Sequence, residues 1–250
     1  MSSQQKSTIR TLLEQDRAWS AYALADLDPG FIEDTDWYLN RYAVFMTYSG
    51  IEPPVLFSHG EADSLRPLVS EIPPGEYQVS IRQEHFEILK PRLVLAEPIP
   101  MQRMVLNRTQ FHSDIDSAAP TPLSSNELPD IMELFDQQTD QPDAFVPAQL
   151  AQGTFHGIYE NGKMISFGGT HVVSRIAGIA AVGSIFTHPS HRGKGLATKA
   201  TAAVVRKLLE WDIQTIVLNV SPENKPAVRC YERLGFNPVY SYYEGAGTIT

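Results

Sequence analysis

Residues 185–197 of the chain read IFTHPSHRGKGLA. The stretch joins an apolar run to a helix-forming run through a short loop that contains Gly193 and Gly195. Glycine lets the backbone approach a ligand closely, and the first amides of a helix have no acceptor within the helix. With the positive end of the helix dipole and the nearby charges of Arg192 and Lys194, these amides suit an anion such as a pyrophosphate.

The loop alone does not identify its ligand. It matches neither the Walker pattern GxxxxGK[ST] nor the dinucleotide pattern GxGxxG. Two glycines at this spacing are also typical of a simple tight turn. The interpretation therefore depends on residues later in the chain.

A second informative stretch, residues 224–236, reads NKPAVRCYERLGF. Asn224 is a suitable N-cap and Gly235 a suitable C-cap for a helix between them. Ala227 and Tyr231 are four residues apart and share one face of that helix. The small Ala227 leaves room one turn below the phenol of Tyr231.

The rest of the second half alternates strands with helices. We expect strands at 154–159, 164–174, 178–187, 215–220 and 236–243, and helices at 195–211 and 224–234. Residues 160–163, ENGK, are typical of a hairpin turn. This order predicts an α+β (mixed α/β) fold with a central mixed sheet flanked by helices.

The first hundred residues show a mixed α+β pattern without a recognisable catalytic spacing. We expect a helix at 7–24, a short helix at 61–69, and strands within 37–48, 55–58, 77–81 and 92–95. The domains are predicted at 1–100 and 101–250. The polar stretch 113–126 is either a linker or an internal loop.

Composition excludes several classes of protein. The formal net charge of −9 argues against a broad nucleic-acid-binding surface and is compatible with a cationic or amine substrate. The sequence has no apolar run of about 18 residues, so we expect no membrane span. Cys230 is the single cysteine, which rules out an intrachain disulfide framework, and a cytoplasmic location is expected.

Together, the two stretches resemble the GNAT superfamily of N-acetyltransferases. That family carries R/Q-x-x-G-x-G/A at its acyl-CoA pyrophosphate loop, and residues 192–197 read RGKGLA. It often carries N-x-x-A-x-x-x-Y-x-x-L-G-F one helix and one strand later, which residues 224–236 match without a gap. The resemblance covers about 101–250, and the pattern of the first third looks similar to a degenerate copy of the same fold.

The resemblance implies acetyl-CoA, or another acyl-CoA, as cosubstrate, and it implies a set of residues that bind it: Ile185, Phe186, Thr187, Arg192, Gly193, Lys194, Gly195, Leu196, Ala197, Thr198, Asn219, Asn224 and Ala227. Tyr231 would protonate the leaving thiolate, and a neutral amine would attack the thioester directly. General acid help of this kind contributes about 10²–10⁴-fold.

The general base is less clear, because the strand at 178–187 holds no carboxylate. Candidates are His171, His156, Glu160 and an ordered water, and His171 is the preferred one because histidine titrates near neutrality. His171 could instead be a hydrogen-bonded histidine of the sheet. Cys230 is interpreted as structural, since no activating base lies near it in the sequence.

The leading hypothesis is therefore an N-acetyltransferase that acts on a small-molecule amine or on an amino acid or peptide. Alternatives are a longer acyl donor, an amino-acid acceptor, or an acyl-CoA-binding sensor with little turnover. No metal, membrane or nucleic-acid partner is expected, and a homodimer is left open.

Overall fold

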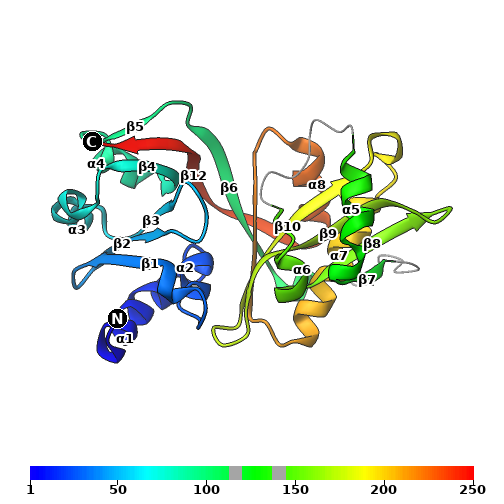
Figure 1. Cartoon of the computed structure of the whole chain (residues 1–250), viewed down its shortest axis with the longest axis horizontal. Coiled ribbons are helices and arrows are strands. Elements are labelled where there is room, and N and C mark those ends of the chain that lie inside the picture. The colour runs from blue at the N-terminus through cyan, green and yellow to red at the C-terminus, as the bar shows by residue number, and fades with distance from the viewer. Residues whose placement is uncertain (113–119, 137–144) are drawn as a thin grey trace. The chain divides into compact units, whose positions relative to one another are not determined.

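The computed structural model describes residues 1–112, 120–136 and 145–250, which form two compact units (Figure 1). The first unit comprises Met1–Arg103, Val220–Glu223 and Pro238–Thr250, and the second comprises Met104–Asn219 and Asn224–Asn237. The sequence-based division at residue 101 kept all C-terminal residues in the second part. In the structure, most of the last strand pairs within the first unit.

The second unit is built on a sheet with the strand order β11-β10-β9-β8-β7. Its strands are β7 (Thr121–Leu123), β8 (Phe155–Glu160), β9 (Lys163–Ser174), β10 (Ile179–Thr187) and β11 (Thr215–Val220). Its helices are α5 (Leu128–Phe135), α6 (Gln149–Gln152), α7 (Leu196–Glu210) and α8 (Lys225–Arg233). β10 and β11 are parallel, and the other pairs are antiparallel. These elements confirm the predicted mixed α/β fold with helices on a mixed sheet.

The hairpin between β8 and β9 forms as the sequence predicts. Asn161 has a φ of 52° and Gly162 a φ of 79°, which is the pair of positive values that a type I′ turn requires. Residues 113–119 of the expected linker lie outside the described residues. The remaining part, 120–126, contributes to β7 and to a 3₁₀ turn at Ser125–Glu127.

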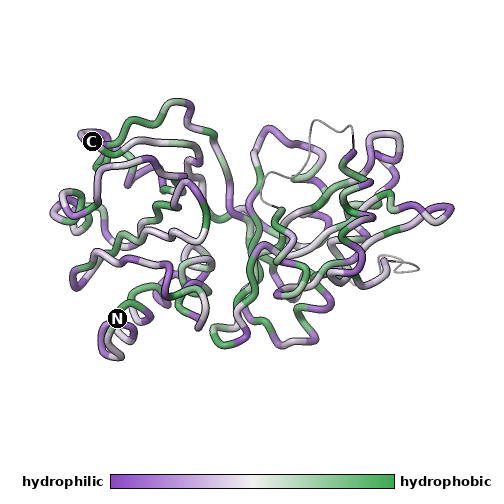
Figure 2. The backbone as a smooth tube through the Cα atoms, in the orientation of Figure 1, coloured by the Kyte–Doolittle hydropathy of each residue, from purple (hydrophilic) through white to green (hydrophobic). Residues whose placement is uncertain are grey.

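Helices α5 and α7 cover opposite faces of the sheet in the second unit. Phe167 of β9 packs into an aromatic and aliphatic core with α5. A Cβ on the next residue, Gly168, would lie 3.5 Å from Ala200 of α7. Neighbouring residues of a strand point to opposite faces, so the two helices lie on different sides. Hydrophobic residues gather along these strands, and the turn between β8 and β9 is hydrophilic (Figure 2).

The first unit has the strand order β1-β2-β3-β4-β12, with β5 also paired to β12. Its strands are β1 (Thr35–Leu39), β2 (Ala43–Tyr48), β3 (Val55–Gly60), β4 (Gly75–Arg82), β5 (Leu93–Leu95) and β12 (Phe236–Ile249). Its helices are α1 (Ser3–Leu13), α2 (Ala21–Ala25), α3 (Ala62–Leu65) and α4 (Gln83–Leu89). β6 (Ile99–Leu106) continues the chain into the second unit.

Two predicted elements of the first unit are each divided in the structure. The expected helix at 7–24 ends at Leu13, because the Asp16 carboxylate accepts the backbone N–H of Trp19 at 3.0 Å and competes with the helix ladder. The expected strand at 37–48 is a hairpin, because the Asn40 side chain accepts the N–H groups of Tyr42 and Ala43 and turns the chain.

The two units repeat one topology. In each, three antiparallel strands lead through helical residues to a fourth strand that is parallel to the third: β1-β2-β3 to β4, and β8-β9-β10 to β11. The expectation that the first third copies the fold of the second half is therefore consistent with the observed strand order. Across the described ranges, no helix is both long and apolar enough to cross a membrane.

Candidate functional site

The glycine loop lies between β10 and α7 and leaves an open space at the start of the helix. Gly193 and Gly195 both have a φ of +76°, in the left-handed region that side chains disfavour. A Cβ built on either glycine would meet no protein atom within 4 Å. Their conformation, and not crowding by the protein, therefore requires glycine, and the space above them is available to a ligand.

The start of α7 is electrostatically prepared for an anion. Gly195 is its N-cap and supplies no side-chain hydrogen bond, and the first turn contains no acidic residue. The amides of that turn keep their donors for a ligand. Arg192 is fixed beside them, because its Nε donates to the carbonyl of Thr187 at 3.1 Å. These features fit a pyrophosphate.

Helix α8 contacts the first turn of α7 through a pair of side chains. The Thr198 hydroxyl and the Cys230 thiol lie 3.2 Å apart, and both side chains are buried. Thr198 can therefore offer a ligand its amide but not its side chain. Burial raises the pKa of the Cys230 thiol, which agrees with a structural cysteine.

The predicted cap of α8 is also present. The Asn224 side-chain oxygen accepts the N–H of Ala227 at 3.2 Å. Its amide NH₂ group remains the part of Asn224 that could contact a cofactor arm. Asn219 lies half-buried in β11, one residue before the strand ends.

Strand β10 separates from β11 partway along its length. Among the described residues, the last pair that joins them is Val182–Leu218. Beyond this point β10 still pairs with β9, through Phe186–Phe167 and Thr187–Ser166. The β11-facing backbone edge of 185–187 therefore has no strand partner on that side within the described residues.

A bulge lies where the two strands part, and the sequence analysis did not identify it. Ser184 has a φ of +51°, and its N–H donates to Nε2 of His171 at 3.1 Å. A Cβ on Gly183 would lie 2.2 Å from that Nε2 atom, so only glycine admits the imidazole. The available signal was the Gly-Ser pair inside an otherwise apolar strand, since glycine within a strand often marks a bulge.

This geometry disfavours His171 as the general base. Its Nε2 already accepts the Ser184 amide, and burial lowers the pKa of His171 to about 4. His156 and Glu160, the other two side chains considered as the general base, are also disfavoured. Burial lowers the pKa of His156 to about 4, and a Glu160 carboxylate oxygen lies 3.0 Å from Nε2 of His191 at the exposed rim of the loop.

Tyr231 lies on the inner face of α8. Its side chain is buried, and its ring packs edge-on against Phe236 at 6.2 Å between centroids. Burial raises the pKa of Tyr231 well above its usual range, so the phenol keeps its proton at neutral pH. A general acid needs this proton, but an ordinary buried core tyrosine keeps it as well, so protonation alone does not assign the role.

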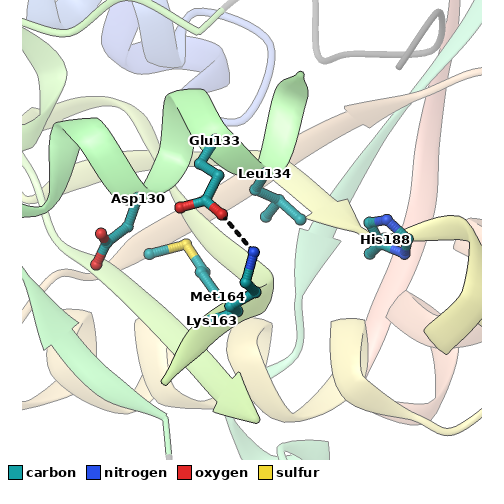
Figure 3. Close-up of a pocket in the computed structure, with 6 residues that line it drawn as sticks. All are labelled: Asp130, Glu133, Leu134, Lys163, Met164 and His188. Carbon is teal, nitrogen blue, oxygen red and sulfur yellow. Dashed lines mark hydrogen bonds and ion pairs between the residues drawn. The ribbon is translucent and has the colours of Figure 1, made fainter. Parts of the chain in front are cut away.

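A small cavity of about 130 Å³ lies between α5 and the β8–β9 hairpin (Figure 3). Lys163 reaches across it to Glu133, with Nζ and Oε1 2.8 Å apart, and His188 stands at one side. The carboxylates of Asp130 and Glu133 would repel a pyrophosphate. We therefore assign the anion site to the glycine loop and not to this cavity.

The first unit repeats the topology but not the site. Its four-residue helix α3 follows Glu61 and carries Asp63 in its first turn, whereas the first turn of α7 holds no acidic residue. β3 and β4 part after Phe57–Ser80, and the next carbonyl, that of Ser58, accepts the indole N–H of Trp19 at 2.8 Å. Trp19 is fully buried. The equivalent opening is thus filled by the protein itself.

No group of three or more histidine, cysteine or acidic side chains that could hold a metal occurs in the part of the chain that the structure covers.

Residues 122–236 match the model of the acetyltransferase (GNAT) family. The chain is 32% identical over 94 residues to an uncharacterised N-acetyltransferase of Bacillus subtilis, which covers 36% of this chain and 35% of that protein. It is 29% identical over 124 residues to an aminoglycoside N(6′)-acetyltransferase type 1 of Klebsiella pneumoniae, which covers 44% of this chain and 58% of that protein. The alignments thus span between a third and three fifths of these relatives.

The whole chain also has structural relatives. A tandem GNAT protein from the clavulanic acid biosynthesis pathway matches with a TM-score of 0.60 at 11% identity, over 98% of this chain and 93% of that one. At this identity the match concerns the fold, and it extends to both units.

Proposed function

Because residues 122–236 match the model of the acetyltransferase (GNAT) family, we propose that the chain transfers an acetyl group from acetyl-CoA to a primary amine by direct attack of the amine on the thioester. The observation that carries this proposal is the open loop of Gly193 and Gly195, which leads directly from the strand edge of 185–187 that has no partner toward β11. The loop would hold the pyrophosphate, and the strand edge would hold the pantetheine arm.

The chain's own groups have distinct tasks in this proposal. Amides of Gly193 to Thr198 donate to the phosphate oxygens, and Arg192 and Lys194 balance their charge. The backbone of 185–187 pairs with the amides of the arm, as a strand would. Asn219, Asn224 and Ala227 border the arm on the side of β11 and α8.

Tyr231 is the proposed general acid. A thiol has an ordinary pKa of about 8.5 and a phenol of about 10, and burial raises that of Tyr231 further. Proton transfer from the phenol to a thiolate is therefore uphill until positive charge develops on the attacking amine. Tyr231 thus acts by donating a hydrogen bond to the sulfur early and its proton late.

The acceptor amine must lose a proton before it attacks, since an alkyl ammonium has a pKa of about 10. With His171 engaged by the bulge, we propose that an ordered water removes this proton. The net charge of −9 favours a cationic acceptor. The name of the Klebsiella relative, an aminoglycoside acetyltransferase, places amino sugars among the acceptors to test first.

Two alternatives use the same site. A longer acyl chain or an amino-acid acceptor would change the specificity but not the roles above. An acyl-CoA sensor with little turnover would keep the loop and would not need Tyr231. The presence of Tyr231 at the motif position that resembles the family's general acid favours catalysis over sensing.

One experiment separates these alternatives. The purified protein is incubated with acetyl-CoA and a panel of amino sugars, polyamines, amino acids and peptides, and free thiol is followed over time. The proposal expects amine-dependent thiol release with at least one acceptor class. Saturable CoA binding without any amine-dependent release would favour the sensor, and absence of CoA binding would refute the site.

A further inference from the structure

A second cavity lies in the second unit, between the C-terminal half of α7 and the edge of the sheet at β7 and β8. Its volume is about 430 Å³, and pockets that bind small molecules measure roughly 300–1,000 Å³. β7 stands at the end of the strand order and pairs with β8, and α7 packs across β8 (Figure 1). The cavity therefore lies beneath one helix at an edge of the sheet.

The sequence of α7 leaves this space. Near its start the helix packs closely on the sheet, since a Cβ on Gly168 of β9 would lie 3.5 Å from Ala200. About one turn later Ala203 lines the cavity, followed on the same face by Lys207 and Glu210. Because the side chain of Ala203 ends at its methyl group, room remains above β8.

His156 of β8 borders the same space. The preceding Phe155 belongs to the core on the α5 side, and neighbouring residues of a strand point to opposite faces, so His156 faces α7. The residue is 8% exposed, and its Nδ1 is buried without a hydrogen bond in the described structure. A buried polar group of this kind costs stability, so the cavity differs from a simple apolar packing gap.

The charges around His156 favour an anion. Burial, and then the charges of Lys207 and Arg206, lower its pKa to about 4. Glu210 acts in the opposite direction and has the smallest effect of these. The imidazole is therefore neutral at physiological pH, and the potential that α7 imposes on it is positive. This potential is a local feature, because the whole chain has a net charge of −9.

Both cations can bind a ligand in addition to a partner within the protein. Lys207 Nζ, for example, lies 2.9 Å from Oε2 of Glu210. An ammonium group has three N–H donors and a guanidinium group five, so a carboxylate can join either group beside its first partner through charge-assisted bonds. A phosphate, with its higher negative charge, would be repelled more strongly by Glu210. The charges therefore suit a carboxylate.

Trp211 gives the cavity an aromatic wall. It follows the last residue of α7 and lines the cavity. The Arg175 guanidinium lies 4.1 Å from the centre of its ring, and Lys207 Nζ lies 5.8 Å from it, which stabilises the position of the indole. Pro120 and Pro122 add rigid apolar surface from the side of β7. These surfaces suit a flat ring.

We propose that this cavity is a binding site for a small aromatic carboxylate: Lys207 and Arg206 bind the carboxylate, and the ring packs against Trp211 and the prolines of β7. The site is separate from the glycine loop. Ala203 lies about 10 Å along the helix axis from Leu196, the first residue of α7, and the other lining residues of α7 lie farther still. The inference therefore does not rest on the proposed function.

The test follows the indole N–H signals of ¹⁵N-labelled protein by NMR. The chain has three tryptophans, and the signal of Trp211 is the one that Trp211→Phe lacks. The probe is naphthalene-2-carboxylate, and its uncharged counterpart of the same shape is naphthalene-2-carboxamide. We expect the carboxylate to shift the Trp211 signal saturably and to leave those of Trp19 and Trp37 in place. The amide should bind about tenfold more weakly or worse, because it lacks the charge-assisted bonds.

Three variants assign the contacts. Lys207→Gln should weaken binding of the carboxylate about tenfold and leave that of the amide unchanged. Lys163→Gln is the matched control, because Lys163 is also an exposed lysine paired with a carboxylate, that of Glu133 at 2.8 Å, but lies outside this cavity. It should bind both probes as the natural protein does. Ala203→Leu should fill the cavity and abolish binding of both probes, with a melting temperature close to that of the natural protein.

The possible results are decisive for the site. A Trp211 signal that does not move with millimolar naphthalene-2-carboxylate overturns the inference. Equal affinities for the acid and the amide overturn the carboxylate contact, as does equal weakening by Lys207→Gln and Lys163→Gln. Binding that persists in folded Ala203→Leu places the probe elsewhere and also overturns the inference. CoA affinity, measured on the same samples, tests the proposed function separately.

Discussion

Replacement of Gly195 by alanine tests the loop most directly, because the structure separates its effect on the fold from its effect on a ligand. Gly195 has a φ of +76°, and a Cβ there would meet no protein atom within 4 Å. The substitution therefore causes no clash in the empty protein. Its only internal cost is the left-handed conformation.

The two expected magnitudes differ widely. The left-handed conformation costs an L-residue about 1–2 kcal/mol, and the reduced freedom of the unfolded chain returns about 0.4–1 kcal/mol. The net loss of about 1 kcal/mol lowers the melting temperature by about 2–4 °C for a chain of this size. A Cβ that displaces the pyrophosphate from two amides removes two charge-assisted hydrogen bonds, about 3 kcal/mol or more, and weakens CoA binding by about 10²-fold or more.

Gly162 provides a matched control within the same unit. It has a φ of +79° with no atom within 4 Å of a built Cβ, and it lies in the β8–β9 turn. Gly162→Ala should lower the melting temperature by about the same 2–4 °C. Calorimetry should show that this variant binds CoA as tightly as the natural protein does. If Gly195→Ala binds CoA as tightly as Gly162→Ala does, the pyrophosphate does not lie against the loop, and the assignment fails.

Other perturbations test the remaining parts of the site. Tyr231→Phe should lower kcat about 10²-fold or more and change the KM for acetyl-CoA less than about twofold; a matched loss in both would mean that Tyr231 only packs. The folded-state pKa of His171, about 4, lies below the unfolded value of about 6.5, so its contribution to stability is complete above pH 6.5 and is lost as the pH falls toward 4. Urea titrations of His171→Asn should therefore show a shallower acid destabilisation, by up to about 3 kcal/mol, and an unchanged pH dependence would show that His171 is not buried neutral. Trp19→Ala should destabilise the first unit by about 3–5 kcal/mol and leave CoA affinity unchanged, and a change in affinity would contradict a purely structural indole.

The sequence could predict those parts of the site that short segments determine. The glycine loop follows from the left-handed conformations that Gly193 and Gly195 permit, and α8 follows from its Asn224 cap. Both are set by residues within one turn of each other. The hairpin at Asn161–Gly162 is local in the same sense.

The bulge at Ser184 could not be predicted in this way. Its conformation depends on a hydrogen bond to His171 of the neighbouring strand, and the register of that strand is a tertiary property. For the same reason the sequence suggested His171 as a base. The residue type gives the ordinary pKa of a histidine, but the burial that lowers this pKa depends on the tertiary structure. The break after Leu13 likewise depends on the side chain of Asp16, which the apolar periodicity of the helix does not register.

The two units show that the shared topology does not by itself create the site. Each has parallel strands that separate, and each places helical residues between them. In the first unit, α3 is short and therefore has a weaker helix dipole, and Glu61 and Asp63 lie at its N-terminus. The indole of Trp19 donates to the carbonyl of Ser58, which a ligand would otherwise use. Replacing Glu61 by glycine would remove one carboxylate but would leave the short helix α3 and the Trp19 contact unchanged. In the second unit, by contrast, both glycines, the fifteen-residue α7 and the open edge of β10 occur together. We therefore expect CoA binding to require all three features at once, and we expect none in the first unit, which has the fold without them.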